Sequence, residues 1–201
     1  LTMHYTPLPL NTSALTGTGT AQDPYKLTCS NDFKLIDKNP SAYYEVANDI
    51  DFMSIPFDGP KRAFTGQLDG KGYRLSNLCV MGGGLLNEVK EAATITNINL
   101  ESPIMLLSDK HLDMAAGILA NSMQGSVDTA GVASSALLSN VHVANPVIKG
   151  VGYKEIIGTI VGYVALNTDA PLTLCFNVPT TTAYECVQVN NDASVYLYNC
   201  I

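Results

Sequence analysis

The stretch "ATITNINL" at residues 93–100 alternates apolar and polar side chains and places an asparagine two residues after Ile95. The same aliphatic-x-Asn pattern occurs in "RLSNLCV" (74–80), "LLSNVHV" (137–143) and "YLYNCI" (196–201). Alternation with a period of two residues is typical of β-strands. A motif that returns several times in one chain indicates repeated architecture rather than a single reaction centre.

A second recurrent element is a glycine followed by small aliphatic residues, which is found at Gly84, Gly117 and Gly158. Each of these glycines precedes one aliphatic-x-Asn motif. Repeats of roughly 20 to 40 residues are typical of solenoids, in which each repeat contacts mainly its neighbours. The pattern therefore predicts stacked β-repeats, with glycine allowing tight corners or close backbone approach.

We predict an all-β fold, a right-handed parallel β-helix in which equivalent positions stack about 4.8 Å apart. The amides of one column can donate to and accept from each other along the axis. The predicted column consists of Asn77, Asn97, Asn140 and Asn199. The alternative is a β-sandwich, which also has short strands. A sandwich, however, gives no reason for asparagine to recur at the same position of the apolar alternation in several strands.

The predicted domain organisation is an extended arm over residues 1–20 and a β-helix domain over 21–201. "SNDFKLIDKNP" (30–40) is the best helix candidate, since Ser30 or Asn31 can cap it and Asn39-Pro40 can end it. "HLDMAAGILANSM" (111–123) has some helical character, but Gly117 lies in its middle.

The composition excludes several classes of function. Charged residues make up 14% of the chain and the net charge is −7, so the clustered cations of nucleic-acid binders are missing. No apolar run is long enough to cross a bilayer, so membrane insertion is not expected. The low charge and the abundance of Ser, Thr and Asn favour a secreted or cell-surface protein. The cysteines form no C-x-x-C pair, which gives little support to a zinc or thioredoxin-like site.

Five cysteines allow one or two disulfides. We predict a bond between Cys175 and Cys186 that staples an inserted loop at about 171–192. Two unpaired core cysteines, or a bond from either residue to Cys200, are the alternatives. The pairing of Cys29 and Cys79 is left open.

At "GTGTAQDPYKLTCSNDFKLI" (17–36) and "FTGQLDGKGYRLSNLCV" (64–80) the chain resembles bacterial surface proteins that carry GLUG repeats. These include adhesin-like proteins and the β-helical regions of IgA1-specific metallopeptidases. The resemblance implies a right-handed β-helix with a short N-terminal capping helix in an extracellular setting. Residues 165–195 depart from the pattern, and the H-E-x-x-H zinc motif is absent, so the resemblance implies a scaffold rather than an activity.

Asp49 and Asp51 lie two residues apart and would share one face of a strand. They could shape a turn through backbone hydrogen bonds, hold a Ca²⁺ ion, or act as the carboxylates of a carbohydrate-active β-helix. The local cations are Lys61, Arg62, Lys71 and Arg74. Asp69-Gly70 is interpreted as a turn signal, and His142 as an outward strand residue. We expect no catalytic residue, cofactor or resident metal.

The predicted function is a non-catalytic extracellular structural or adhesion module, either a repeating subunit of a surface fibre or a fragment of a larger adhesin. The last motif would leave an open sheet end, so the expected partners are other copies of the chain or further coils of a parent protein. A host or environmental glycan or protein is a further candidate partner. The alternative function is a carbohydrate-binding or carbohydrate-active β-helix protein.

Overall fold

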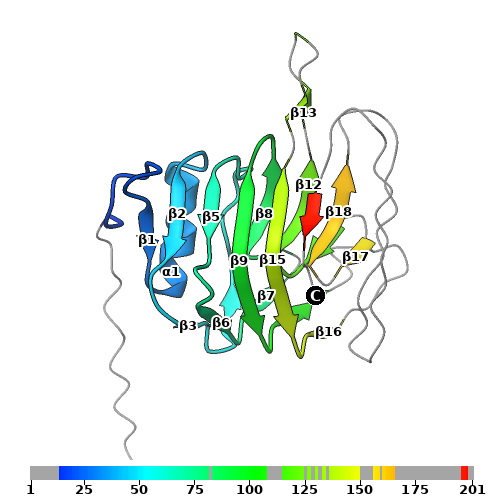
Figure 1. The fold of residues 1–201 in the computed structure, drawn as a ribbon. Coiled ribbons are helices and arrows are strands. Elements are labelled where there is room, and N and C mark those ends of the chain that lie inside the picture. Colours follow the sequence, from blue (N-terminus) through cyan, green and yellow to red (C-terminus); the bar gives the residue numbers. More distant parts are fainter. Residues whose placement is uncertain are drawn as a thin grey trace, which may run out of the picture.

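A computed structural model describes residues 14–81, 83–107, 115–124, 126–127, 130, 133–134, 136–149, 156–158, 160–165 and 196–198. Strands dominate the described residues, and one short helix lies near the N-terminal end (Figure 1). The strands are short because turns and single glycines interrupt the apolar alternation every few residues.

The largest sheet runs the length of the described structure, and all its strand pairs are parallel (Figure 1). Its main order is β1 (Tyr25–Leu27), β2 (Tyr43–Val46), β5 (Gln67–Asp69), β9 (Thr94–Glu101), β15 (Leu137–Ala144) and β19 (Tyr196–Tyr198). Two further members are β3 (Ile50–Asp51) and β6 (Arg74–Ser76). β5 pairs with the first half of β9 and β6 with its second half, so β9 corresponds to two shorter strands earlier in the chain.

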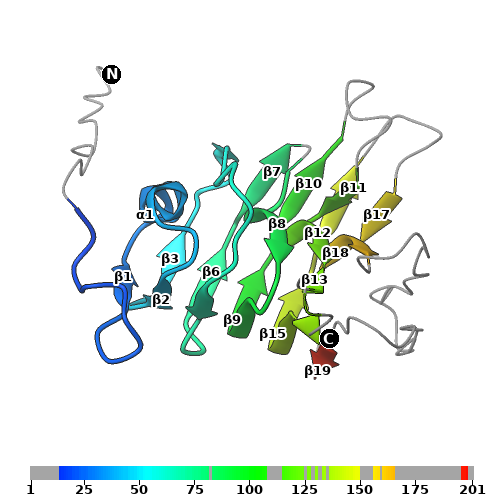
Figure 2. The same cartoon turned by 90° about the horizontal axis from the view of Figure 1, so that it is seen from above.

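Three smaller parallel sheets are built from the segments between these strands. One contains β4 (Pro56–Phe57), β7 (Cys79–Met81), β10 (Ile104–Leu106) and β16 (Val147–Lys149). The others contain β8 (Leu86–Lys90), β12 (Ala120–Gln124) and β18 (Val161–Ala165), and β11 (Ala115–Gly117) with β17 (Ile156–Gly158). Figure 2 shows β7 and β10 on one side of the molecule and β9 and β15 on the other.

The predicted all-β class with parallel sheets is confirmed. Among the described strand pairs only β13 (Ser126–Val127) with β14 (Ala133–Ser134) is antiparallel, whereas a β-sandwich is built from antiparallel pairs. The described part of 111–123 forms strands rather than a helix, because Ala120–Gln124 pairs on both sides with β8 and β18.

The core lies between the sheets and is filled by the inward residues of each alternation. In the largest sheet Tyr44, Leu68, Ile95 and Leu138 are register partners, and each is at most 2% exposed. Burying such a side chain contributes about 1.5–3 kcal/mol relative to leaving it in water. Stacked apolar columns therefore hold one strand over the next.

A helix covers the N-terminal end of the core, as predicted. It consists of α1 (Ser30–Lys34) followed by the 3-10 turn η1 (Leu35–Lys38), and Asn39 is its C-cap. Phe33 and Ile36 are fully buried, and the Phe33 ring lies 5.7 Å from that of Phe52.

The N-cap of this helix is Cys29 rather than the predicted Ser30 or Asn31. The buried Asp32 carboxylate accepts hydrogen bonds from the backbone amide of Cys29 at 3.2 Å and from that of Thr28 at 2.7 Å. Because Asp32 satisfies these amides, the helix begins one residue earlier than the small polar residues suggest.

Residues 14–20 belong to the segment that we predicted to be an extended arm. In the structure their backbone is bonded to the sheet, since Thr16 O accepts from the amide of Lys26 at 2.9 Å and Gly19 O from that of Tyr43 at 3.0 Å. The remainder of the predicted arm lies outside the described residues.

Candidate functional site

Two of the predicted asparagines are hydrogen-bonded to each other on the outer side of the largest sheet. Asn140 Nδ2 donates to Asn97 Oδ1 over 2.9 Å, and Asn97 Nδ2 donates to Asp69 Oδ1 over 2.9 Å. We refer to Asp69, Asn97 and Asn140 as the amide column. Both amides donate toward the N-terminal end, and Asn97 also accepts from Asn140 of the next repeat, so the column has one direction and Asp69 stands at its acceptor end.

The backbone at both asparagines explains why this residue type recurs. Asn97 has φ 55° and Asn140 has φ 54°, in the left-handed region that asparagine and glycine tolerate best. The buried alternation changes phase at each asparagine, so that Ile95 and Ile98 are both buried in β9, as are Leu138 and Val141 in β15. Asparagine therefore provides both the bend and the bond between repeats.

Asn77 lies in a separate column, which corrects the single file of four that we predicted. Its Nδ2 atom donates to Asp51 Oδ1 over 2.9 Å, and its backbone amide donates to Glu101 O over 2.9 Å. The reason is register, because Asn77 follows β6, which pairs with the second half of β9 rather than with the half that precedes Asn97. Asn199 lies outside the described residues.

The carboxylates of Asp49 and Asp51 both accept hydrogen bonds from neighbouring residues. Asp51 accepts from Asn77 and, at 2.7 Å, from the backbone amide of Met53, and these hydrogen bonds lower the pKa of Asp51. Asp49 Oδ1 accepts from the backbone amide of Arg74 at 2.9 Å, and Asp49 Oδ2 lies 3.5 Å from the Arg74 guanidinium. Both carboxylates bond to neighbouring repeats, as a structural role requires, and the calcium interpretation stays an untested prediction.

The four cations that the sequence places near these aspartates do not form one cluster. The backbone amides of Lys61 and Arg62 bond to the carboxylate of Asp37. Lys71 pairs with carboxylates on β2 and β5, and the Arg74 guanidinium also lies 3.3 Å from Glu101. The arrangement neutralises charge locally and leaves no shared cationic groove.

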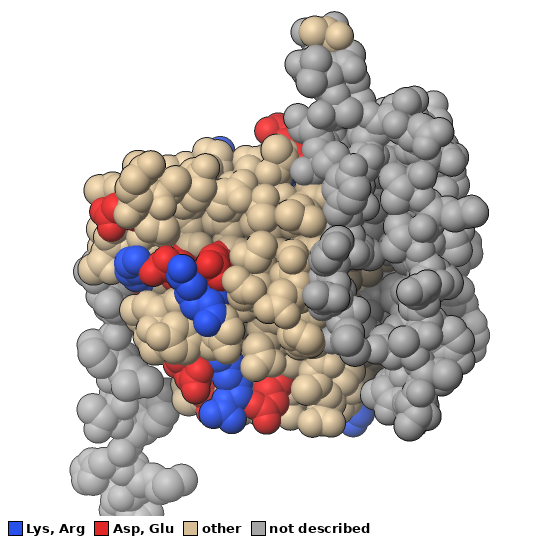
Figure 3. All heavy atoms as spheres, viewed as in Figure 1, with Lys and Arg blue, Asp and Glu red and all other residues tan. Residues whose placement is uncertain are grey.

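An ion-pair row crosses the outer face of β1, β2 and β5 and consists of Lys26, Glu45, Lys71 and Asp69. Lys26 pairs with Glu45, and Lys71 Nζ lies 3.5 Å from Glu45 Oε2 and 3.3 Å from Asp69 Oδ2. Figure 3 shows blue and red side chains alternating across this part of the face. The row joins the amide column at Asp69.

These contacts shift the pKa values of Glu45, Asp69 and Lys71. The hydrogen bond from Lys26 lowers the pKa of Glu45, and the contact with Asp69 raises the pKa of Lys71. Burial alone would raise the pKa of Asp69, but the hydrogen bonds from Asn97 and from Lys71 lower it below its ordinary value. Glu45, Asp69 and Lys71 are therefore charged near neutral pH.

The recurrent glycines lie where neighbouring backbones come closest. A Cβ atom on Gly84 would be 2.6 Å from Gly117 O, and one on Gly117 would be 2.5 Å from Gly162 N. Gly117 and Gly158 are register partners in β11 and β17. Gly84 and Gly117 therefore require glycine for close approach rather than for a left-handed backbone, which agrees with one of the two roles expected from the sequence.

Cys29 and Cys79 are free thiols, and burial raises the pKa of Cys79. The predicted Cys175–Cys186 disulfide and Cys200 lie outside the described residues. His142 is exposed on β15, as predicted, with Nε2 2.9 Å from Asn140 Oδ1.

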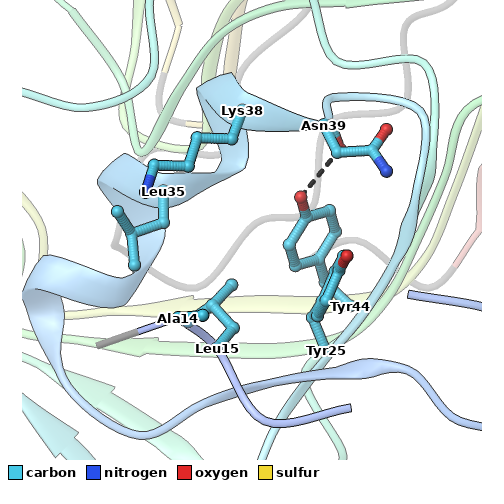
Figure 4. A pocket seen from close by; sticks show the side chains of 7 residues that line it. All are labelled: Ala14, Leu15, Tyr25, Leu35, Lys38, Asn39 and Tyr44. Carbon is cyan, nitrogen blue, oxygen red and sulfur yellow. Dashed lines mark hydrogen bonds between the residues drawn. The ribbon is translucent and has the colours of Figure 1, made fainter. Parts of the chain in front are cut away.

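A small apolar pocket of about 100 Å³ separates the N-terminal segment from the helix (Figure 4). Ala14 and Leu15 line one side, and Leu35 lies opposite them. The Tyr44 hydroxyl donates to Asn39 O over 2.7 Å at its edge, and burial, with a contribution from Tyr25, raises the pKa of Tyr44. We assign this pocket to packing of the helix.

Within the described ranges, His, Cys, Asp and Glu side chains do not gather into a group of three or more that could hold a metal ion. The helical segments of that same part of the chain are also too short to span a membrane.

Comparison with known proteins gives one similarity. A stretch of 137 residues, 58% of this chain, is 27% identical to part of halomucin from Haloquadratum walsbyi. That stretch spans 1% of the length of halomucin. No protein-family model matches the chain, so the resemblance to GLUG-repeat proteins stays a prediction, and no solved structure matches it.

Sequence reasoning missed Asp69, which it interpreted only as part of a turn. The signal was present as an aliphatic-Asp pair one repeat before an aliphatic-x-Asn motif. Ile50-Asp51 precedes Asn77 and Leu68-Asp69 precedes Asn97 in the same relation, separated by 26 and 28 residues. The aspartate at this position of the repeat accepts a hydrogen bond from the first asparagine side chain of each column.

Proposed function

We propose that this chain is a non-catalytic structural module of a larger secreted or cell-surface protein and that it forms a right-handed parallel β-helix. The three consecutive strand groups β5 to β8, β9 to β12 and β15 to β18 support the fold. Each group pairs in parallel with the next in the same order. The right hand is inferred from the strong preference of parallel crossover connections.

The amide column is the observation that carries the proposed role. Asn140 donates to Asn97 and Asn97 donates to Asp69, while Asp49 and Asp51 accept from donors of the neighbouring repeat. Catalytic carboxylates must face a substrate with the correct protonation state. Here the carboxylates connect repeat to repeat, which suits a rigid scaffold.

The similarity to halomucin, a surface protein, supports the extracellular setting. Because the matched stretch is a very small part of halomucin, it also favours a module within a long chain over a complete enzyme. The resemblance to GLUG-repeat adhesins points to the same role. Adhesion by this module, or assembly of its copies into a fibre, is the finer form of this proposal.

Two measurements test the role. Brief protease treatment of intact source cells, followed by mass spectrometry, should release peptides of this chain before any cytoplasmic marker, and their appearance only after lysis would contradict a surface location. The purified chain, incubated with neutral and acidic polysaccharides, should release no more reducing ends than its heat-denatured control. Release that disappears in Asp51→Asn would instead establish the carbohydrate-active alternative.

A further inference from the structure

A polar hollow of about 410 Å³ lies on the outer face of the largest sheet, over β1, β2, β5 and β9. Ala21, Gln22 and Pro24 line it on the N-terminal side, and the lining continues to Thr94 and Thr96 of β9. The ion-pair row crosses it, as the charged band in Figure 3 shows. Its volume falls in the range of about 300–1,000 Å³ typical of ligand sites.

Register places two kinds of side chain on the floor. Tyr43, Gln67 and Thr94 are register partners and form a line that begins with an aromatic ring. Lys26, Glu45, Asp69 and Thr96 form the parallel line that carries the charges. Tyr43 is 40% exposed although neighbouring Tyr44 is buried, so a large ring faces solvent beside fixed donors and acceptors.

The hollow has as many positive as negative side chains, and this balance indicates the class of ligand that it can bind. Its two lysines and two carboxylates are paired with each other, so an anion or a cation would meet as many like charges as opposite ones. An apolar ligand would remove these ions from water without replacing their hydrogen bonds. A neutral polyhydroxyl ligand can donate to Glu45 and Asp69 and accept from Lys71 at the same time.

We propose that this hollow binds a neutral oligosaccharide of a few sugar rings laid across the strands. The apolar face of one sugar ring packs on the Tyr43 side chain, and hydroxyl groups of the oligosaccharide form hydrogen bonds with Gln67, Lys71 and Thr94. The proposal goes beyond the scaffold role and gives the module a recognition surface distinct from Asp49 and Asp51. It does not require any reaction on the glycan.

The test is titration of the isotope-labelled full chain, monitored by NMR, with maltotriose, cellotriose, mannotriose and galactotriose, each to about 10 mM, and with digalacturonate for comparison. At least one neutral trisaccharide should give saturable shifts at Tyr43, Gln67 and Thr94. Tyr43→Ala should weaken that binding about tenfold, whereas Tyr43→Phe should retain it. Tyr73→Ala is the matched control, because Tyr73 is equally exposed but lies outside the hollow, and it should bind like the unmodified chain.

Three outcomes would overturn the proposal. These are no saturable binding of any neutral sugar, binding of digalacturonate alone, or equal affinity in Tyr43→Ala and the unmodified chain. Absence of binding would leave the scaffold role intact, since that role is tested by surface exposure and by the lack of bond cleavage.

Discussion

The Nδ2 atom of Asn140 lies 2.9 Å from Oδ1 of Asn97, and the two residues are separated by 43 positions in the chain. Each lies at a left-handed bend of its strand. One residue type therefore sets the backbone conformation of its own repeat and the hydrogen bond to the next.

Replacing Asn97 by alanine should lower the free energy of unfolding by about 2–3 kcal/mol. The change removes two hydrogen bonds, worth about 1 kcal/mol each, and places a residue that disfavours φ 55° at the bend. Urea unfolding followed by circular dichroism measures the loss. Asn145→Ala is the matched control, because Asn145 has φ 52° but no side-chain hydrogen bond within the described residues, and it should cost about 1 kcal/mol. Equal losses in both variants would show that the column bonds contribute nothing.

Acid should destabilise the fold through the lowered carboxyl pKa values of Asp69, Asp51 and Glu45. A carboxyl group with a lower pKa in the folded state stabilises the fold above its unfolded pKa of about 4 and loses that contribution as pH falls through the folded value. Stability should thus be nearly constant from about pH 7 to 5 and fall below about pH 4. Chemical unfolding at several pH values should show a smaller fall in Asp69→Asn, and an unchanged profile in that variant would contradict the role given to Asp69.

Gly117→Ala should destabilise the chain by about 1–3 kcal/mol, because the added methyl group would lie 2.5 Å from Gly162 N in the neighbouring repeat. Gly83→Ala is the control. The atom nearest to its Cβ is 3.8 Å away, so its stability should stay within about 0.5 kcal/mol of the unmodified chain. Thermal melts of the two variants in parallel make the comparison, and a tolerated Gly117→Ala would refute the close approach.

Asp32→Ala should cost about 2 kcal/mol, because it leaves the amides of Thr28 and Cys29 without their acceptor at the start of α1. Asp58→Ala removes the same charge from an exposed side chain and should change stability by less than about 0.5 kcal/mol. Urea midpoints measure both changes. If the two variants were equally stable, the cap would not depend on Asp32.

The alternation of apolar residues predicted much of the fold, since Ile95 and Leu138 carry the period of two that identifies buried strands. It also placed Asn97 and Asn140 at one phase, and the structure brings them together. The separate column of Asn77 could not be foreseen, because the pairing of β6 with the second half of β9 depends on how many residues each turn consumes.

Less of the candidate site could be predicted from the sequence. Aspartate before glycine is a common turn signal, which concealed the acceptor role of Asp69. The hollow around Tyr43 combines residues from four strands and the 21–24 segment, and only the register of those strands assembles them.

The most direct test of the account is the direction of the strand pairs in solution. An isotope-edited NOESY spectrum should show contacts between the register partners Gln67, Thr94 and Leu137 in the pattern of parallel strands, without strong Hα–Hα cross-peaks. It should also connect the Asn140 side-chain amide to Asn97. Strong Hα–Hα contacts between these strands would establish antiparallel pairing, and with it the stacked repeats and the scaffold role would both be refuted.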